Sequence, residues 1–309
     1  MDRRTFLGTA TLAGTCLALG KLGRALAAPV APQAKPTNPT PPYDLVAVRG
    51  GEPAAMFDSA VAALGGMAAF VKKGQRVLVK PNMGWDVPPE RAGNTNPQLV
   101  ARIVQQCLAA GAKEVYVFDH PCDDWKRSYK TSGIEAAAKQ AGAKVAPAAS
   151  EQYFHTVALT GAKKLQSAKV HELLMQADVF INVPILKHHS SSDVTIGMKN
   201  MMGVVWDRGF WHGNDLHQCI ADFAAYRQPD LVVVDAYNVL MANGPRGVSA
   251  ADVVNMKALL VSTDVVAADA AAAKLFGVDP ASVHYIQLAA QEGRGRMDLD
   301  KLNIKKIAL

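Results

Sequence analysis

Cysteine is scarce in this sequence, with four among 309 residues and none in a C-x-x-C pair. A disulfide-framework fold and a zinc ribbon both need more paired cysteines, so both classes are excluded. A ferredoxin-type cluster needs four closely placed thiolates, so an intrinsic iron–sulfur cluster is not expected. Aromatic residues make up only 6%, whereas 50% of residues are hydrophobic and 19% charged. This is a globular composition, which excludes collagen-like, coiled-coil and disordered chains.

No apolar run is long enough for an ordinary membrane-spanning helix, which needs about 20 residues. The N-terminal run from about residue 9 to residue 22 is shorter and follows Arg3 and Arg4 in RRTFLG. Residues 25–27 read Ala-Leu-Ala, a typical cleavage site. The segment resembles a twin-arginine (Tat) export signal. We therefore predict a signal peptide over 1–27, the Tat translocase as a partner, and a periplasmic protein with no stable membrane span after cleavage. The alternative is a general secretory signal with a chance arginine pair.

Residues 28–43 read APVAPQAKPTNPTPPY and predict a proline-rich, extended linker. From residue 44 to residue 309, short apolar runs alternate with helical patterns, and no second linker interrupts them. The apolar runs lie at 45–48, 77–79, 115–118, 179–183 and 231–234, and the helical stretches at 54–71, 97–110, 132–141, 216–226 and 265–276. This alternation predicts a single α/β domain with a mostly parallel central sheet flanked by helices. The pattern weakens around 147–175, where a small subdomain could form.

Polar residues follow several of these apolar runs directly. Lys80 and Asn82 follow the second run, Asp119 the third, Lys187 comes soon after the fourth, and Asp235 follows the last. In an open parallel sheet the ligand crevice lies beyond the carboxyl ends of the strands. We therefore expect these side chains to meet at one edge of the sheet.

The segment 187–217 is the richest in functional groups and holds four of the eight histidines. Its lysines and arginine could hold an anion, and its glycines would let backbone N–H groups approach a ligand. Its imidazoles could instead bind a metal ion. The candidate metal ligands are His188, His189, His212 and Asp119, although adjacent histidines on regular backbone point apart.

Three residues nearer the C-terminus add to this picture. Arg246 lies in a turn, Asn-Gly-Pro-Arg-Gly, from which it could reach an anion. Asp264 is predicted to cap the helix that follows it. Asp269 lies inside that apolar helix, and an unpaired buried carboxylate would cost several kcal/mol, so we expect it to have a partner.

Several runs together resemble one known family. They are VLVKPNMG, NTNPQLV, AGAKEVYVFD, ADVFINVPILKHH, IGMKNMMGVV, LVVVDA, NGP and STDVVAADAAAAKLFG. They are similar to the family catalogued as domain of unknown function 362, and the similarity extends from about residue 76 to residue 291. The resemblance implies a site at Lys80, Asn82, Asp119, Asn182, Lys187, His189, Lys199, Asn200, His212, Asp235 and Asp269. Asn94-Thr95-Asn96-Pro97 departs from the family's Thr-His-Pro-like pattern, and the cysteine run of some relatives is missing.

The functional hypothesis is an exported periplasmic protein that binds a metal ion or an anionic ligand or cofactor at the strand ends, as a redox-associated enzyme. Its predicted catalytic residues are Lys187, His189 and His212. The predicted ligand-binding residues are Lys80, Asn82, Asn182, Lys199, Asn200, Asp235, Arg246 and Asp269. The alternative is a non-catalytic accessory or maturation protein for a periplasmic redox, iron–sulfur system. A periplasmic redox partner fits both hypotheses, and nothing in the sequence indicates nucleic-acid binding.

Overall fold

A computed structural model describes residues 40–309 of the chain. The predicted signal peptide, residues 1–27, and most of the predicted linker lie outside the described residues. No helix within the described range is both long enough and apolar enough to cross a lipid bilayer.

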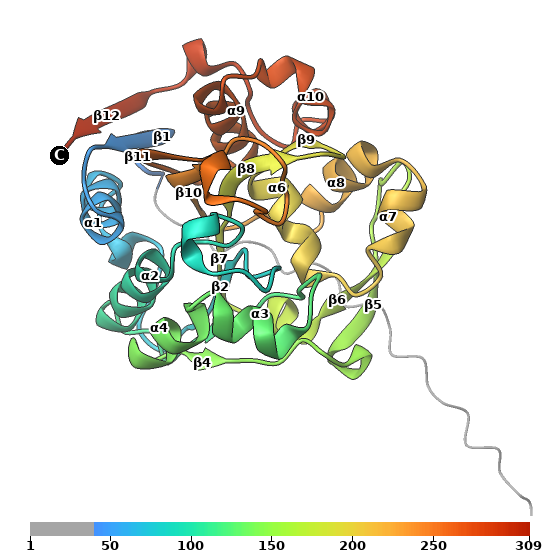
Figure 1. Ribbon diagram of the computed structural model, residues 1–309, viewed down its shortest axis with the longest axis horizontal. Coiled ribbons are helices and arrows are strands. Elements are labelled where there is room, and N and C mark those ends of the chain that lie inside the picture. The colour runs from blue at the N-terminus through green and yellow to red at the C-terminus, as the bar shows by residue number, and fades with distance from the viewer. Residues whose placement is uncertain (1–39) are drawn as a thin grey trace, which may run out of the picture.

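A ten-stranded sheet forms the centre of the domain (Figure 1). Eight strands follow in the order β12-β1-β11-β10-β7-β2-β3-β4, and β8 pairs with both β10 and β9. The strands are β1 (Leu45–Arg49), β2 (Arg76–Pro81), β3 (Glu114–Val117), β4 (Lys144–Val145), β7 (Val179–Val183), β8 (Ile185–His189), β9 (Asp193–Thr195), β10 (Leu231–Leu240), β11 (Val253–Ser262) and β12 (Ile304–Ala308).

Six of the nine strand pairs in this sheet are parallel. The predicted α/β fold with a mostly parallel sheet is therefore confirmed. The apolar runs of the sequence analysis correspond to β1, β2, β3, β7 and β10, and the other five strands of this sheet were not predicted. The longest of these five is β11, which pairs antiparallel with both β1 and β10. Antiparallel neighbours need no helical crossover, and β11 follows β10 with no α-helix between them. The alternation of strands and helices therefore gave no signal for it.

Helices cover both faces of the sheet, as the alternation of side chains along the strands requires. In β2, Val77 and Val79 pack into the core beneath α1, α2 and α4. Leu78 faces the opposite way, into the core that α6, α8, α9 and α10 complete. The helices are α1 (Pro53–Ala63), α2 (Pro97–Ala109), α3 (Trp125–Thr131), α4 (Ile134–Gln140), α5 (Glu172–Gln176), α6 (Gly197–Asn200), α7 (Gly209–Gly213), α8 (Leu216–Ala224), α9 (Val265–Phe276) and α10 (His284–Gln291).

The helix ends follow local sequence signals. Asp264 caps α9 as predicted, because its carboxylate accepts hydrogen bonds from the backbone N–H groups of Val266 (2.9 Å) and Ala267 (3.0 Å). The helix expected over 54–71 stops earlier, at Ala63. Gly65 and Gly66 follow with φ angles of 99° and 83°, a left-handed conformation that ends a helix.

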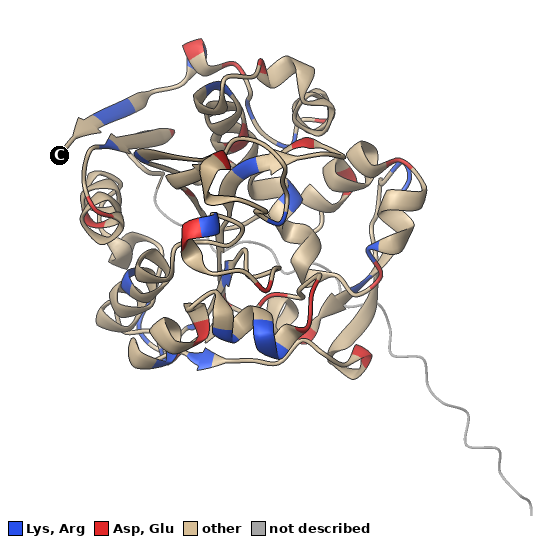
Figure 2. Cartoon of the chain, viewed as in Figure 1, with Lys and Arg blue, Asp and Glu red and all other residues tan. Residues whose placement is uncertain are grey.

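The segment with the weak pattern, 147–175, forms a separate two-stranded sheet of β5 (Phe154–Ala158) and β6 (Ser167–His171). Phe154 and Val170 of this hairpin belong to the same hydrophobic core as Phe180 of the central sheet. The hairpin is therefore a lobe of the domain that shares its core. Charged residues of both signs alternate over the outer helices and loops in the view of Figure 2.

Candidate functional site

A cavity of about 760 Å³ opens where the carboxyl ends of β2, β3 and β8 meet the segment that follows β9. Eight of the predicted site residues line it: Lys80, Asn82, Asp119, Lys187, His189, Lys199, Asn200 and His212. Strand ends supply five of these eight, at or just beyond the end of each strand. Side chains from Lys80 to His212 therefore meet in one polar pocket, even though they are far apart in the chain.

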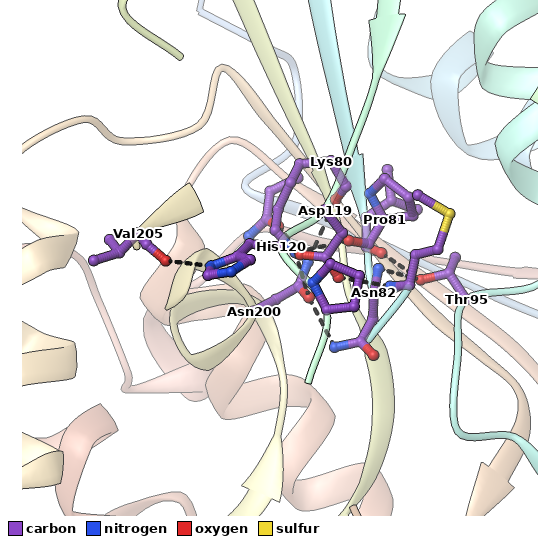
Figure 3. A network of polar contacts seen from close by, with 12 residues as sticks. Lys80, Pro81, Asn82, Thr95, Asp119, His120, Asn200 and Val205 are labelled. Atoms are coloured by element: carbon purple, nitrogen blue, oxygen red, sulfur yellow. Dashed lines mark hydrogen bonds and ion pairs between the residues drawn. The ribbon is translucent and has the colours of Figure 1, made fainter. Parts of the chain in front are cut away.

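Lys80 and Asp119 form a buried ion pair at the base of the cavity, with 2.8 Å between Nζ and Oδ1 (Figure 3). Lys80 Nζ also donates hydrogen bonds to Pro81 O (2.7 Å) and Asn200 Oδ1 (3.0 Å). The ammonium group thus makes two hydrogen bonds and one ion pair. Burial lowers the pKa of Lys80, and the neighbouring Asp119 opposes that shift. Lys80 is therefore already neutralised and offers a ligand little additional charge.

Glycine at position 203 allows the chain to pass directly over this ion pair. A Cβ atom there would lie 2.7 Å from Lys80 Nζ and would collide with Asp119 Oδ1. The carbonyl of Gly203 also accepts a hydrogen bond from the backbone N–H of His120, 2.9 Å away. The absence of a side chain is therefore a requirement of the site.

A chain of three asparagine amides connects the strand ends to α6. Asn200 Oδ1 accepts from Asn82 Nδ2 (3.0 Å), and Asn200 Nδ2 donates to Asn182 Oδ1 (2.8 Å). Asn182 Nδ2 in turn donates to Gly197 O (2.8 Å). Each amide has one orientation that satisfies its neighbours, so the chain fixes the position of α6 relative to β2 and β7.

Lys187 lines the cavity without a carboxylate partner. Its Nζ donates to Gly93 O (2.6 Å) and Asn82 Oδ1 (3.1 Å), and it lies 5.9 Å from the centre of the Trp85 ring. Burial lowers the pKa of Lys187 to about 7. A neutral amine has two N–H groups, and both acceptors are in place, so near neutral pH its lone pair is free.

Lys199 is the second lysine of the cavity without a counter-ion. It is 8% exposed, and within residues 40–309 its Nζ makes no hydrogen bond or ion pair. Burial lowers the pKa of Lys199 to about 8, and the charge of Arg208 contributes to that shift. The ammonium form is therefore desolvated and uncompensated in the empty pocket.

His189 is held as a neutral hydrogen-bond donor. Its Nδ1 accepts a hydrogen bond from the backbone N–H of Ser191, 3.1 Å away, so the ring proton lies on Nε2. Burial lowers the pKa of His189 to about 2, and the charges of Lys199 and Lys187 add to the effect. The imidazole can thus donate Nε2–H to an acceptor in the cavity.

His120 has the opposite tautomer, and the sequence analysis did not select it. Its Nδ1 donates to Val205 O at 2.9 Å (Figure 3), which leaves the Nε2 lone pair free. Its ring stacks on Trp206 with 4.9 Å between centroids. Burial lowers the pKa of His120, so its ring is a neutral base. Its position directly after Asp119, at a strand end, was the available signal.

Arg208 is the arginine of 187–217 that the sequence analysis counted among the side chains able to hold an anion, without placing it among the predicted site residues. Its guanidinium donates to His120 O (2.8 Å) and Pro121 O (2.7 Å) and lies 3.6 Å from Cys122 Sγ. These contacts hold the segment before α7 against the loop after β3, beside the exposed His212. Such contacts depend on the path of two loops, which the sequence pattern does not reveal.

Comparison with known proteins places the chain in a family. The family model described as a domain of unknown function (DUF362) matches residues 77–274. The chain belongs to the DUF362 family. A thylakoid-associated protein of Synechocystis sp. is 30% identical over 241 residues, which cover 75% of this chain and 72% of that protein. A solved structure, the lactate racemase apoprotein from Thermoanaerobacterium thermosaccharolyticum, is 12% identical with a TM-score of 0.48. The match covers 74% of this chain and 56% of that structure.

Five predicted residues of this DUF362 domain do not line the cavity: Asn182, His188, Asp235, Arg246 and Asp269. Asp269 accepts from the backbone N–H groups of Gly197 (2.7 Å) and Met198 (2.9 Å), and it thereby fixes the start of α6. The expected partner of this carboxylate is thus backbone. Burial raises the pKa of Asp269 to about 8.

The other corrections have equally local causes. Asp235 lies inside β10, which continues to Leu240, and it accepts from the backbone N–H groups of Asn96 (2.7 Å) and Tyr237 (3.0 Å). Arg246 forms an ion pair with Asp123 (3.2 Å) outside the cavity wall. Asp235 therefore fixes backbone outside the cavity wall, at Asn96 and Tyr237. The Arg246 side chain pairs with Asp123 and does not line the cavity.

The four predicted metal ligands do not assemble into a metal centre. No group of three or more His, Cys, Asp or Glu in the described part of the chain could hold a metal ion. Asp119 is paired with Lys80, and His188 accepts a hydrogen bond from Gly244 N at its Nδ1. A metal-bound His usually donates a hydrogen bond from its second ring nitrogen. In His189 the Nδ1 atom instead accepts a hydrogen bond, from the backbone N–H of Ser191. The donor set of this pocket does not fit a metal held by protein ligands alone.

Proposed function

We propose that the cavity binds a small anionic molecule, such as a carboxylate or a phosphate. One observation carries the proposal: Lys199 is a buried cation with no counter-ion on the wall of a large polar pocket. An isolated buried ammonium costs several kcal/mol, which an anionic ligand would offset.

The balance of charge in the pocket supports the same conclusion. Five of its lining side chains are Lys or Arg, and three are Asp or Glu. Two of these acids are already paired within the pocket, Asp119 with Lys80 and Glu151 with Lys169. The lining residues left outside these two pairs are three basic side chains, Lys187, Lys199 and Arg208, and one acidic side chain, Asp207. Lys199, Arg208 and the Nε2–H of His189 form a set of donors suited to carboxylate or phosphate oxygens.

Two neutral nitrogen bases, Lys187 and His120, line the same pocket. The pKa of Lys187, about 7, suits it to proton transfer near neutral pH, and His120 offers a free ring nitrogen. This feature favours an enzyme over the alternative of a passive accessory protein. The proposed division of roles has Lys199, Arg208 and His189 holding the anion, while Lys187 or His120 exchanges a proton with it.

Isothermal titration calorimetry with oxalate and with inorganic phosphate tests anion binding. An anion beside Lys199 stabilises its charged form, so binding at pH 8.5 should take up protons. The measured enthalpy should then depend on the ionisation enthalpy of the buffer. Lys199→Met should weaken binding by about tenfold or more. Lys306→Met, a change at an exposed lysine of β12, should not. Equal affinity of the wild type and Lys199→Met for every anion tried would refute the proposal.

We also propose that the protein acts after export, as its N-terminal sequence predicts. The supporting features are Arg3 and Arg4, the short apolar run and the Ala-Leu-Ala site. Cell fractionation should find the protein in the periplasm, and replacement of both arginines by lysine should retain it in the cytoplasm. Export of the double variant at the normal level would instead indicate the general secretory route.

A further inference from the structure

Lys199 has the properties of a nucleophile as well as those of a charge. Lys199 lines the cavity and is nine-tenths buried, and its Nζ makes no hydrogen bond or ion pair anywhere in residues 40–309. The other two buried lysines differ. Lys80 donates two hydrogen bonds and pairs with Asp119, and Lys187 donates to two oxygens. Among these three buried lysines, only Lys199 can therefore lose its N–H protons to an imine without giving up an existing hydrogen bond or ion pair.

The surroundings of Lys199 also favour its neutral form. The charge of Cys122 opposes the effect of burial and that of Arg208 adds to it, and no carboxylate is among the groups whose charge acts on the pKa of Lys199. Burial lowers its pKa to about 8, so about half of the amines are unprotonated at that pH. An unprotonated lysine amine in a desolvated pocket is the usual starting point for attack on a carbonyl carbon.

We propose that Lys199 forms a Schiff base with the carbonyl group of a 2-oxo acid bound in the cavity. The inference rests on the anion binding proposed above. The amine nitrogen bonds to the carbonyl carbon, and the carbonyl oxygen takes up a proton from the nitrogen to give a carbinolamine. A second proton, from solvent, allows the C–O bond to break and release water. The product is a protonated imine, which keeps the positive charge at position 199.

The requirement for a carboxylate next to the carbonyl comes from the neighbours of Lys199. Arg208 and the Nε2–H of His189 lie on the same wall, and the charge of Lys199 acts on His189. In a 2-oxo acid the carboxylate is bonded directly to the carbonyl carbon. The carboxylate can thus lie among these donors while the carbonyl carbon reaches the amine. A neutral ketone of the same size lacks this interaction and should bind less well.

The test uses the full-length protein with pyruvate and sodium borohydride, which reduces an imine to a stable secondary amine. Intact-mass and peptide mass spectrometry should show one adduct per chain, at Lys199. Hydroxyacetone, a neutral ketone of similar size, should label Lys199 about tenfold less at equal concentration. Lys199→Arg keeps a charge but cannot form the imine, so it should show no adduct. Lys306→Met should be labelled like the wild type.

The outcomes separate this inference from the proposed function. If calorimetry shows that pyruvate or oxalate binds, but borohydride traps no adduct, the imine is refuted and anion binding stands. If no anion binds and nothing is trapped, both proposals fail. Labelling spread over surface lysines, or labelling at Lys187, would also overturn the assignment to Lys199. Circular dichroism and the thermal midpoint of each variant show whether it is folded, and Lys199→Gln provides a second variant if Lys199→Arg is not.

Discussion

Lys80 and Asp119 stand at the ends of the neighbouring strands β2 and β3, with Nζ and Oδ1 2.8 Å apart, and both side chains are almost completely buried. Asp119 also accepts a hydrogen bond from the backbone N–H of Met83 at 2.7 Å. The pair therefore fixes the base of the cavity, and it accounts for the charge of Lys80 without a ligand.

Asp119→Asn should destabilise the protein strongly. The change leaves the Lys80 ammonium buried without an opposite charge, and the loss of one partner of a buried pair typically costs about 3–5 kcal/mol. Urea unfolding followed by circular dichroism measures this loss. As a control, Glu135→Gln removes the acid of an exposed ion pair with Lys139 in α4 and should leave the midpoint nearly unchanged. Similar midpoints for the two variants would contradict the structural role of the buried pair.

Gly203→Ala should damage the site, whereas Gly213→Ala should not. A methyl group at position 203 would collide with the Lys80–Asp119 pair, and a Cβ at position 213 has nothing within 4 Å. Overpacking of this kind typically costs about 1–3 kcal/mol. The thermal midpoints of the two variants, measured side by side, test the prediction. Retention of both wild-type stability and wild-type anion binding in Gly203→Ala would show that the chain yields easily at this point.

Anion affinity should fall as the pH rises through about 8. The pKa of Lys199 is lowered to about 8 by burial, so above that pH the empty pocket loses a positive charge. Calorimetry with oxalate between pH 6.5 and pH 9.5 should show a dissociation constant that increases over this window. In Lys199→Arg the guanidinium stays charged throughout, so the same increase should be much smaller. An equally steep pH dependence in that variant would assign the effect to another group.

Lys187 should make stability rise with pH. Its folded-state pKa is about 7, below its unfolded value of about 10.4. Between these values the unfolded state holds the extra proton, so each pH unit adds up to about 1.4 kcal/mol to the free energy of unfolding. Below pH 7 the Lys187 amine is protonated in both the folded and the unfolded state. The folded state then carries the full free-energy cost of the buried charge. In Lys187→Met this contribution should vanish, so the difference between the two proteins should change between pH 7 and pH 10. A difference in the free energy of unfolding that stays constant with pH would mean that folding does not lower the pKa of Lys187.

The sequence predicted much of this site because strand ends are visible in the sequence. Lys80 and Asp119 follow apolar runs that become β2 and β3, and parallel strands bring their carboxyl ends to one edge. Asp235 looked equivalent, yet β10 continues for five residues beyond it, so it lies within a strand. The point at which a buried strand ends is set by its partners, which the local sequence does not show.

The adjacent histidines point apart, as the sequence analysis expected of regular backbone. Successive side chains of a strand point to opposite faces, so His188 and His189 of β8 cannot both face the cavity. The role of His120 and the contacts of Arg208 were not predicted. Their orientations depend on backbone carbonyls, those of Val205, His120 and Pro121, which are brought close only by the folded loops. Every residue type carries a backbone carbonyl, so the sequence does not show which carbonyl a side chain will contact.

The chain of amides through Asn182, Asn200 and Asn82 has a consequence for how a ligand would enter. Because α6 is tied to two strands, the helix cannot swing aside to bring the Lys199 amine into water while the pocket is empty. The protein thus carries the electrostatic penalty before any ligand arrives, and a ligand spends little of its binding energy on rearranging the receptor. Ligand binding should then resemble entry into a preorganised site. Its association rate should depend on access through the mouth of the pocket and on attraction between opposite charges.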